Sequence, residues 1–158
     1  MLYYTEFGLS EREVPGEISI CVYLSGCCHK CRNCHYPLLQ EKDYGERLMD
    51  YYKDIIELYR KQATCVCFLG EGANTDIEHN EFRLVVQYAR LHGLKTCLYS
   101  GRDVGVEEWM QMFDYVKVGS YIEELGGLEN RNTNQVFWQK QGHFFVKRND
   151  LFLKYQIP

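Results

Sequence analysis

Four of the chain's eight cysteines, Cys27, Cys28, Cys31 and Cys34, lie within eight consecutive positions, and this run constrains the fold more than any other feature. Thiolates separated by three and then by two intervening residues can surround one inorganic iron–sulfur cluster, because a short loop lets each sulfur point inward. Three such ligands leave one iron open to a small molecule. The ferredoxin spacing, which would start from Cys28, requires a cysteine where Leu38 stands.

A second kind of metal site fits the same stretch. Cysteine and histidine at short spacing also suit tetrahedral zinc, and His29 or His35 could complete such a site. A zinc protein would be colourless, whereas an iron–sulfur protein is brown. The residues alone therefore leave both an iron–sulfur cluster and a zinc knuckle open.

Length and composition narrow the class of protein. The 158 residues suit one domain but not a complete eight-fold barrel, which needs about 200 residues or more. Cysteine makes up about one residue in twenty, less than in a secreted disulfide scaffold. We find neither a signal peptide nor an apolar run long enough for a membrane helix, so we expect a cytoplasmic protein without a membrane span. A net charge of -4 without a basic cluster argues against a nucleic-acid partner.

After residue 17 the chain alternates between strand patterns and helix patterns. Residues 18–24 alternate apolar and polar side chains and predict a strand that ends just before the cysteine run. Further strands are expected at residues 64–69, 95–99 and 115–118, and helices at residues 43–61, around Phe82 up to Gly93, and at residues 103–113. This order indicates a parallel sheet with right-handed crossovers. We therefore expect an α/β fold: a partial (β/α) TIM-like barrel with a mainly parallel sheet, forming a single domain over residues 1–158.

The ends of these elements carry weaker signals. Residues 1–17 predict an irregular or short-stranded lead-in that closes on a Pro-Gly turn. Asp43 and Glu46 resemble a capping box at the start of the first helix. Residues 136–140 and 143–147 around Gly142 predict a hairpin near the C-terminus.

The remaining four cysteines lie in predicted strands. Cys65 and Cys67 are two apart in one strand, which is unsuitable for a metal loop, and Cys97 lies in the next strand. Cys21 lies in the strand before the cysteine run. All four are expected to be small apolar core residues.

Two turns that follow predicted strands are candidate binding segments. Gly70-Glu71-Gly72 follows the strand at 64–69, and its glycines would let the backbone approach a ligand that the Glu71 carboxylate could reach. Ser100-Gly101-Arg102 follows the strand at 95–99, and Arg102 could grip a carboxylate through its forked guanidinium. An ordinary strand-to-helix turn and a surface arginine are the alternative interpretations.

The spacing of Cys27, Cys31 and Cys34 matches the CxxxCxxC signature, and residues 26–36 resemble the cluster loop of the radical S-adenosylmethionine enzymes. The resemblance implies that these three thiolates hold a 4Fe-4S cluster whose open iron chelates S-adenosylmethionine. Most members have an aromatic residue immediately before the last cysteine, where this chain has Asn33. The sequence differs from the common pattern at that position.

The same resemblance implies which other residues contact S-adenosylmethionine. In the family a Gly-Gly-Glu turn contacts the amino group of the methionine moiety, and the order here is Gly70-Glu71-Gly72. The segment after the third strand resembles one that holds the ribose or carboxylate. The implied cofactor-binding residues are His35, Tyr36, Gly70, Glu71, Gly72, Ser100 and Arg102.

Across most of its length the chain resembles the branch of glycyl-radical enzyme activases that serves anaerobic ribonucleoside-triphosphate reductase. That branch implies reductive cleavage of S-adenosylmethionine to generate a glycyl radical in a loop of the reductase, with a low-potential electron donor such as flavodoxin or ferredoxin. Two other functions stay open. One is an activase for a different, formate-lyase-like enzyme, and the other is a non-enzymatic zinc or iron–sulfur module.

Overall fold

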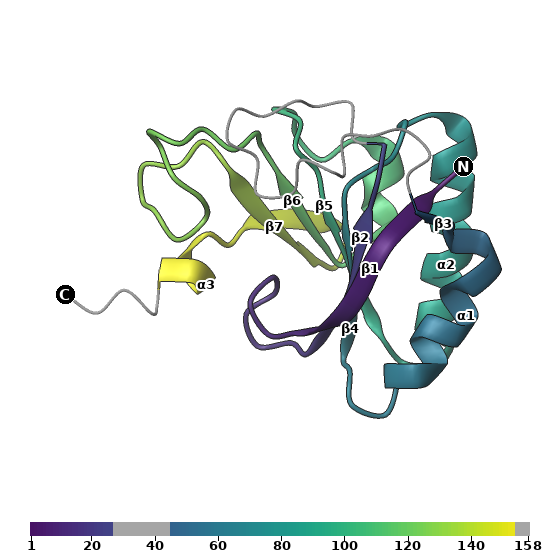
Figure 1. Cartoon of the computed structure of the whole chain (residues 1–158). Coiled ribbons are helices and arrows are strands. Elements are labelled where there is room, and N and C mark those ends of the chain that lie inside the picture. Colours follow the sequence, from purple (N-terminus) through teal and green to yellow (C-terminus); the bar gives the residue numbers. More distant parts are fainter. Residues whose placement is uncertain (27–44, 154–158) are drawn as a thin grey trace.

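The computed structural model describes residues 1–26 and 45–153 of the chain (Figure 1). In this part an eight-stranded sheet runs in the order β3-β1-β2-β4-β5-β6-β7-β8. The four central strands are parallel: β2 (Ser19–Leu24), β4 (Cys65–Leu69), β5 (Lys95–Tyr99) and β6 (Tyr115–Val118). Antiparallel strands extend the sheet on both sides: β1 (Tyr3–Ser10), β3 (Glu46–Arg47), β7 (Val136–Gln141) and β8 (Phe144–Lys147).

The α/β class and the parallel centre of the sheet are confirmed. β4, β5 and β6 lie within one residue of the predicted bounds, and the predicted C-terminal hairpin is present as β7 and β8. The described sheet is open, with β3 at one edge and β8 at the other, so it is not a closed barrel.

One face of the sheet is covered by two helices, α1 (Leu48–Tyr59) and α2 (Asp76–Leu91), which lie side by side in Figure 1. Between them and the sheet, Phe68 of β4 meets Phe82 of α2 edge-on at a ring-centroid distance of 5.4 Å. Phe113 packs against both rings, at 6.1 Å and 5.7 Å. All three side chains are fully buried, so this aromatic cluster anchors α2 to the sheet.

The opposite face carries the predicted core cysteines. Cys21, Cys67 and Cys97 face one another in register across β2, β4 and β5, and Cys65 lies two residues before Cys67. All four are buried free thiols, which confirms their predicted packing role. Val14 covers them from the β1–β2 connection, and the short helix α3 (Asp150–Leu153) packs beside the same cluster. Burial raises the pKa of Cys97 to about 11, so this thiol is protonated at neutral pH.

The predicted helix at residues 103–113 is wrong. Only a 3₁₀-helix, η2 (Glu108–Met112), forms there. Asp103 instead accepts hydrogen bonds from the backbone and hydroxyl of Ser120, which fixes it against the segment after β6. Gly105 also lowers helix propensity in this stretch. A long-range contact therefore overrides the helical pattern, although Phe113 faces inward as predicted.

Two N-terminal boundaries also differ from the prediction. Glu46 pairs with Tyr4 in strand β3, so it does not cap α1, which begins at Leu48 without a side-chain cap. The expected partner Asp43 lies outside the described residues. Residues 3–10 form a full strand, β1, whose half-buried side chains give little periodic signal. In the described ranges no helix is long and apolar enough to cross a membrane.

Candidate functional site

The predicted metal ligands Cys27, Cys31 and Cys34 lie outside the described residues, as do His35 and Tyr36. The structure does show where the chain enters that segment. Gly26 follows β2 with φ +80°, and a β-carbon added to it would lie 3.8 Å from the Cα atom of Gly72. Gly26, the last described residue before the cysteine run, therefore lies directly beside the predicted glycine turn, Gly70-Glu71-Gly72.

The glycine turn needs both of its glycines. Gly70 has φ +120°, and an added β-carbon would lie 3.2 Å from the carbonyl oxygen of Leu24. Gly72 has φ +63° and packs 3.1 Å from the Leu2 side chain by the same measure. The N–H of Gly70 donates to the carbonyl of Tyr99 at 3.0 Å, which joins the turn to the end of β5. Bare backbone thus lies at the carboxyl ends of β2, β4 and β5, where α/β proteins bind ligands.

The structure brings Glu71 and Arg102 together. Arg102 donates from Nε to Oε2 and from Nη2 to Oε1 of Glu71, each at 2.9 Å. Glu71 is only 6% exposed, so this forked pair is largely shielded from water. The forked grip predicted for Arg102 is present, and the carboxylate that it holds belongs to the protein itself.

A second carboxylate completes the arrangement around Arg102. Glu107 accepts from Nη2 at 2.5 Å and from Nη1 at 3.2 Å. The hydrogen bonds that Arg102 donates, first to Glu71 and then to Glu107, raise the pKa of Arg102, and the Arg102 guanidinium lowers the pKa of Glu107. Four of the five guanidinium N–H groups are used by these two carboxylates. Arg102 and Glu107 are therefore both ionised at neutral pH.

Ser100 is buried and supports the backbone of the next turn, Ser100-Gly101-Arg102, which we call the arginine turn. Its Oγ accepts from the N–H of Arg102 at 3.1 Å, and its own N–H donates to the carbonyl of Lys117 at 2.7 Å. Lys117 of β6 is buried and returns a hydrogen bond from Nζ to the carbonyl of Ser100 at 3.2 Å. Its Nζ also donates to the carbonyl of Gly119 at 2.8 Å. Sequence reasoning did not single out Lys117.

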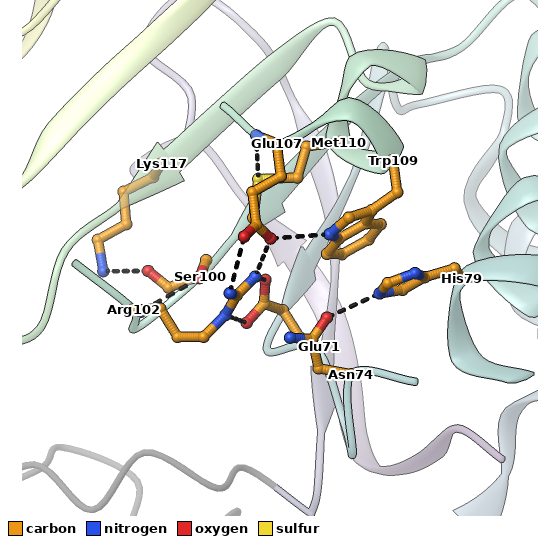
Figure 2. Close-up of polar contacts among 9 residues, drawn as sticks. All are labelled: Glu71, Asn74, His79, Ser100, Arg102, Glu107, Trp109, Met110 and Lys117. Carbon is orange, nitrogen blue, oxygen red and sulfur yellow. Dashed lines mark hydrogen bonds and ion pairs between the residues drawn. The ribbon is translucent and has the colours of Figure 1, made fainter. Parts of the chain in front are cut away.

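Four further side chains around this site were not predicted: Asn74, His79, Glu107 and Trp109. Asn74 precedes α2 and His79 lies in the first turn of that helix, whereas Glu107 is the N-cap of η2 and Trp109 lies within it. Figure 2 shows these four side chains together with Arg102. Together with Arg102 they border an open pocket of about 850 Å³. The one sequence signal for any of them was the position of Asn74 just after the glycine turn.

His79 is held in a neutral state. Burial lowers its pKa; the nearby carboxylates of Asp76, Glu71 and Glu78 oppose that shift, and Arg102 adds to it. Its Nε2 lies 2.7 Å from Oδ1 of Asn74, so the tautomer with a proton on Nε2 donates there.

No group of three histidine, cysteine or acidic side chains that could hold a metal is found among residues 1–26 and 45–153. The four buried cysteines of the sheet pack together in one cluster with Val14, Tyr115, Leu128 and Phe137. The predicted metal ligands lie in residues 27–34, which this observation does not cover. The described residues fit the predicted site in one respect: the bare backbone of the glycine turn lies where the cysteine run begins.

Three comparisons with known proteins give no relative. No family model matches the chain, and no significant match is found among curated proteins or among solved structures.

Proposed function

We propose that the chain is a radical S-adenosylmethionine activase that generates a glycyl radical on anaerobic ribonucleoside-triphosphate reductase. The observation that supports the proposal most directly is the position of Gly26, the last described residue before the CxxxCxxC run: a β-carbon added to it would lie 3.8 Å from the Cα atom of Gly72 in the glycine turn. In this proposal Cys27, Cys31 and Cys34 hold a 4Fe-4S cluster. Such a cluster, once reduced by the electron donor, would supply one electron for reductive cleavage of S-adenosylmethionine to methionine and a 5′-deoxyadenosyl radical, which would abstract a hydrogen atom from the glycine.

The chain's own residues then bind and orient S-adenosylmethionine. In this proposal the backbone of the glycine turn contacts the ligand, because Gly70 and Gly72 carry no side chain that would hold the ligand away. The Glu71 carboxylate is occupied by Arg102, so Glu71 acts by holding the turn in place. The Ser100 hydroxyl, which accepts a hydrogen bond from the backbone N–H of Arg102, holds the arginine turn in a similar way. His35 and Tyr36 complete the proposed contacts.

The proposal also includes the shape of the protein and its surroundings. The open sheet would be a partial (β/α) barrel whose open side admits the glycine loop of the reductase. The reductant would be a low-potential carrier such as flavodoxin or ferredoxin, in the cytoplasm. Excluding water from the site would protect the carbon radical from side reactions.

The first experiment tests cleavage. The protein is reconstituted anaerobically with iron and sulfide, reduced, and incubated with S-adenosylmethionine, and methionine and 5′-deoxyadenosine are measured. We expect a brown protein that forms both products. Bound zinc, a colourless protein and no cleavage would establish the zinc module instead.

The doubled cysteine provides a matched control. Cys27→Ser should lose most of the iron and all cleavage, whereas Cys28→Ser should keep both, because only Cys27 gives intervals of three and two. The reverse result would refute the register and the resemblance that depends on it. Mixing the active protein with the reductase should then give a glycine-centred radical in electron paramagnetic resonance. Cleavage without that signal would point to another activase branch.

A further inference from the structure

A closed ring of side-chain and backbone contacts connects the glycine turn with the arginine turn (Figure 2). One part of the ring consists of the contacts that Arg102 makes with two carboxylates, and we call it the first route. The other part passes through the stacked rings of Trp109 and His79 to Asn74, and we call it the second route. Its members, in order, are Glu71, Arg102, Glu107, Trp109, His79 and Asn74.

The first route is ionic. Arg102 binds Glu71 on one side and Glu107 on the other, as described above. Glu107 then accepts a hydrogen bond from Nε1 of Trp109 at 3.0 Å. Because both carboxylates bind the guanidinium through two oxygens, this route fixes the direction of the Arg102 side chain as well as its position.

The second route is aromatic. The rings of Trp109 and His79 stack with centroids 4.0 Å apart and planes 9° apart. Trp109 also lies over Phe82 of the buried core at 5.7 Å, so the stack is anchored to the fold. From His79 the route passes to Asn74, and the N–H of Asn74 donates to the carbonyl of Glu71 at 3.3 Å.

Asn74 is the residue that this second route holds in an unfavourable conformation. Its φ of +57° lies in the left-handed region, which no other non-glycine residue adopts in the described part of the chain. The His79 hydrogen bond fixes the Asn74 side chain while its backbone closes the glycine turn. The conformation of the turn thus depends on a contact made by α2.

We propose that Asn74, His79, Glu107 and Trp109 are positioning residues that set the glycine turn against the arginine turn for ligand binding. None of them needs to touch the ligand. The identification of the ligand as S-adenosylmethionine rests on the proposed function. Loosening the ring at His79 or Trp109 should weaken ligand binding, although both side chains act only through Asn74 and Glu107.

The test compares variants that break one contact each. Trp109→Phe keeps an aromatic ring but removes the N–H that Glu107 accepts. His79→Phe keeps the stack but removes the donor to Asn74, and His79→Gln keeps a donor without the ring. The control is Arg83→Ala, because Arg83 lies beside the ring and bonds only to exposed Asn80 among the contacts described.

The first measurement is the dissociation constant for S-adenosylmethionine on reconstituted protein. Loss of one hydrogen bond should raise it about fivefold in Trp109→Phe and His79→Phe. His79→Gln should recover part of that loss, Arg83→Ala should match wild type, and kcat at saturation should change little. Ring variants that melt earlier but bind as wild type would overturn the proposal and leave the ring a purely structural feature.

The second measurement does not need the ligand. Amide hydrogen exchange of residues 70–75 should be faster in Trp109→Phe and His79→Phe than in wild type or Arg83→Ala. Unchanged exchange would overturn the positioning role, whatever the ligand is. If wild type fails to bind S-adenosylmethionine but the exchange differs as expected, the proposed function fails and the ring stands.

Discussion

Removing the Arg102 side chain should destabilise the protein because it leaves the buried Glu71 carboxylate without its charged hydrogen-bond partner. In Arg102→Ala, Glu71 would lose both hydrogen bonds of the forked pair while staying only 6% exposed. Removing one partner of a buried ion pair costs about 3–5 kcal/mol. The Arg102 side chain is 20% exposed, so water can partly replace it, and we expect the low end, about 3 kcal/mol. For a chain of this size that corresponds to a fall in Tm of roughly 9 °C.

A double variant separates this cause from simple loss of packing. Glu71→Gln removes the buried charge, so Arg102→Ala should cost less in that background, by about 1–2 kcal/mol. Glu107 is the matched control, since its side chain is 37% exposed and Glu107→Gln should cost less than about 1 kcal/mol.

The assay is urea unfolding followed by circular dichroism at pH 7, for wild type, the three single variants and the double variant. Additive losses in Arg102→Ala and Glu71→Gln would show that the two side chains do not interact energetically. If Arg102→Ala lowers the free energy of unfolding by less than about 1 kcal/mol, the Glu71 carboxylate is not left buried without a partner.

Three further results are expected. The four sheet cysteines, whose pKa values are raised (Cys97 to about 11), should resist iodoacetamide at pH 7.5 until the protein is unfolded, as mapped by mass spectrometry; labelling of Cys97 in the native state would contradict the packing. Phe68→Ala should lose about 3–5 kcal/mol in urea unfolding, whereas Leu91→Ala, 83% exposed, should stay within about 0.5 kcal/mol of wild type. Because burial lowers the pKa of His79, its contribution to stability should be complete above the unfolded pKa of about 6.5 and decrease as pH falls through the lower folded value. His79→Gln should therefore flatten the fall in stability between about pH 7 and 5, and an unchanged slope would contradict a neutral, half-buried His79.

The central strands could be predicted because burial gives them a strong pattern. β4, β5 and β6 are mostly buried, so their apolar runs and short lengths are distinctive. β1 is half-buried, and its irregular alternation gave no clear strand signal. The predicted helix at 103–113 failed for another reason: Asp103 bonds to Ser120, 17 positions further along the chain, and local periodicity does not report such a contact.

One contact of the candidate site could also be predicted from the sequence, and another could not. Glu71 and Arg102 follow neighbouring parallel strands, so their meeting at one edge of the sheet could be expected from topology. The contact of His79 with Trp109 could not, because it depends on the rotation of α2 and on an η2 that forms only with the tertiary fold. Contacts between residues that follow neighbouring strands can thus be predicted from the order of strands along the chain. Contacts made by a helix face can be known only from the packed structure.

Burial makes the four sheet cysteines poor candidates for metal ligands. A metal ligand must be a thiolate, yet burial raises the pKa of Cys67 and Cys97. Those residues also face one another across a sheet, in a cluster closed by Val14. We therefore expect any metal that the chain binds through cysteine to be held by residues 27–34. For that reason, comparing Cys27→Ser with Cys28→Ser decides more about this protein than any substitution among the sheet cysteines.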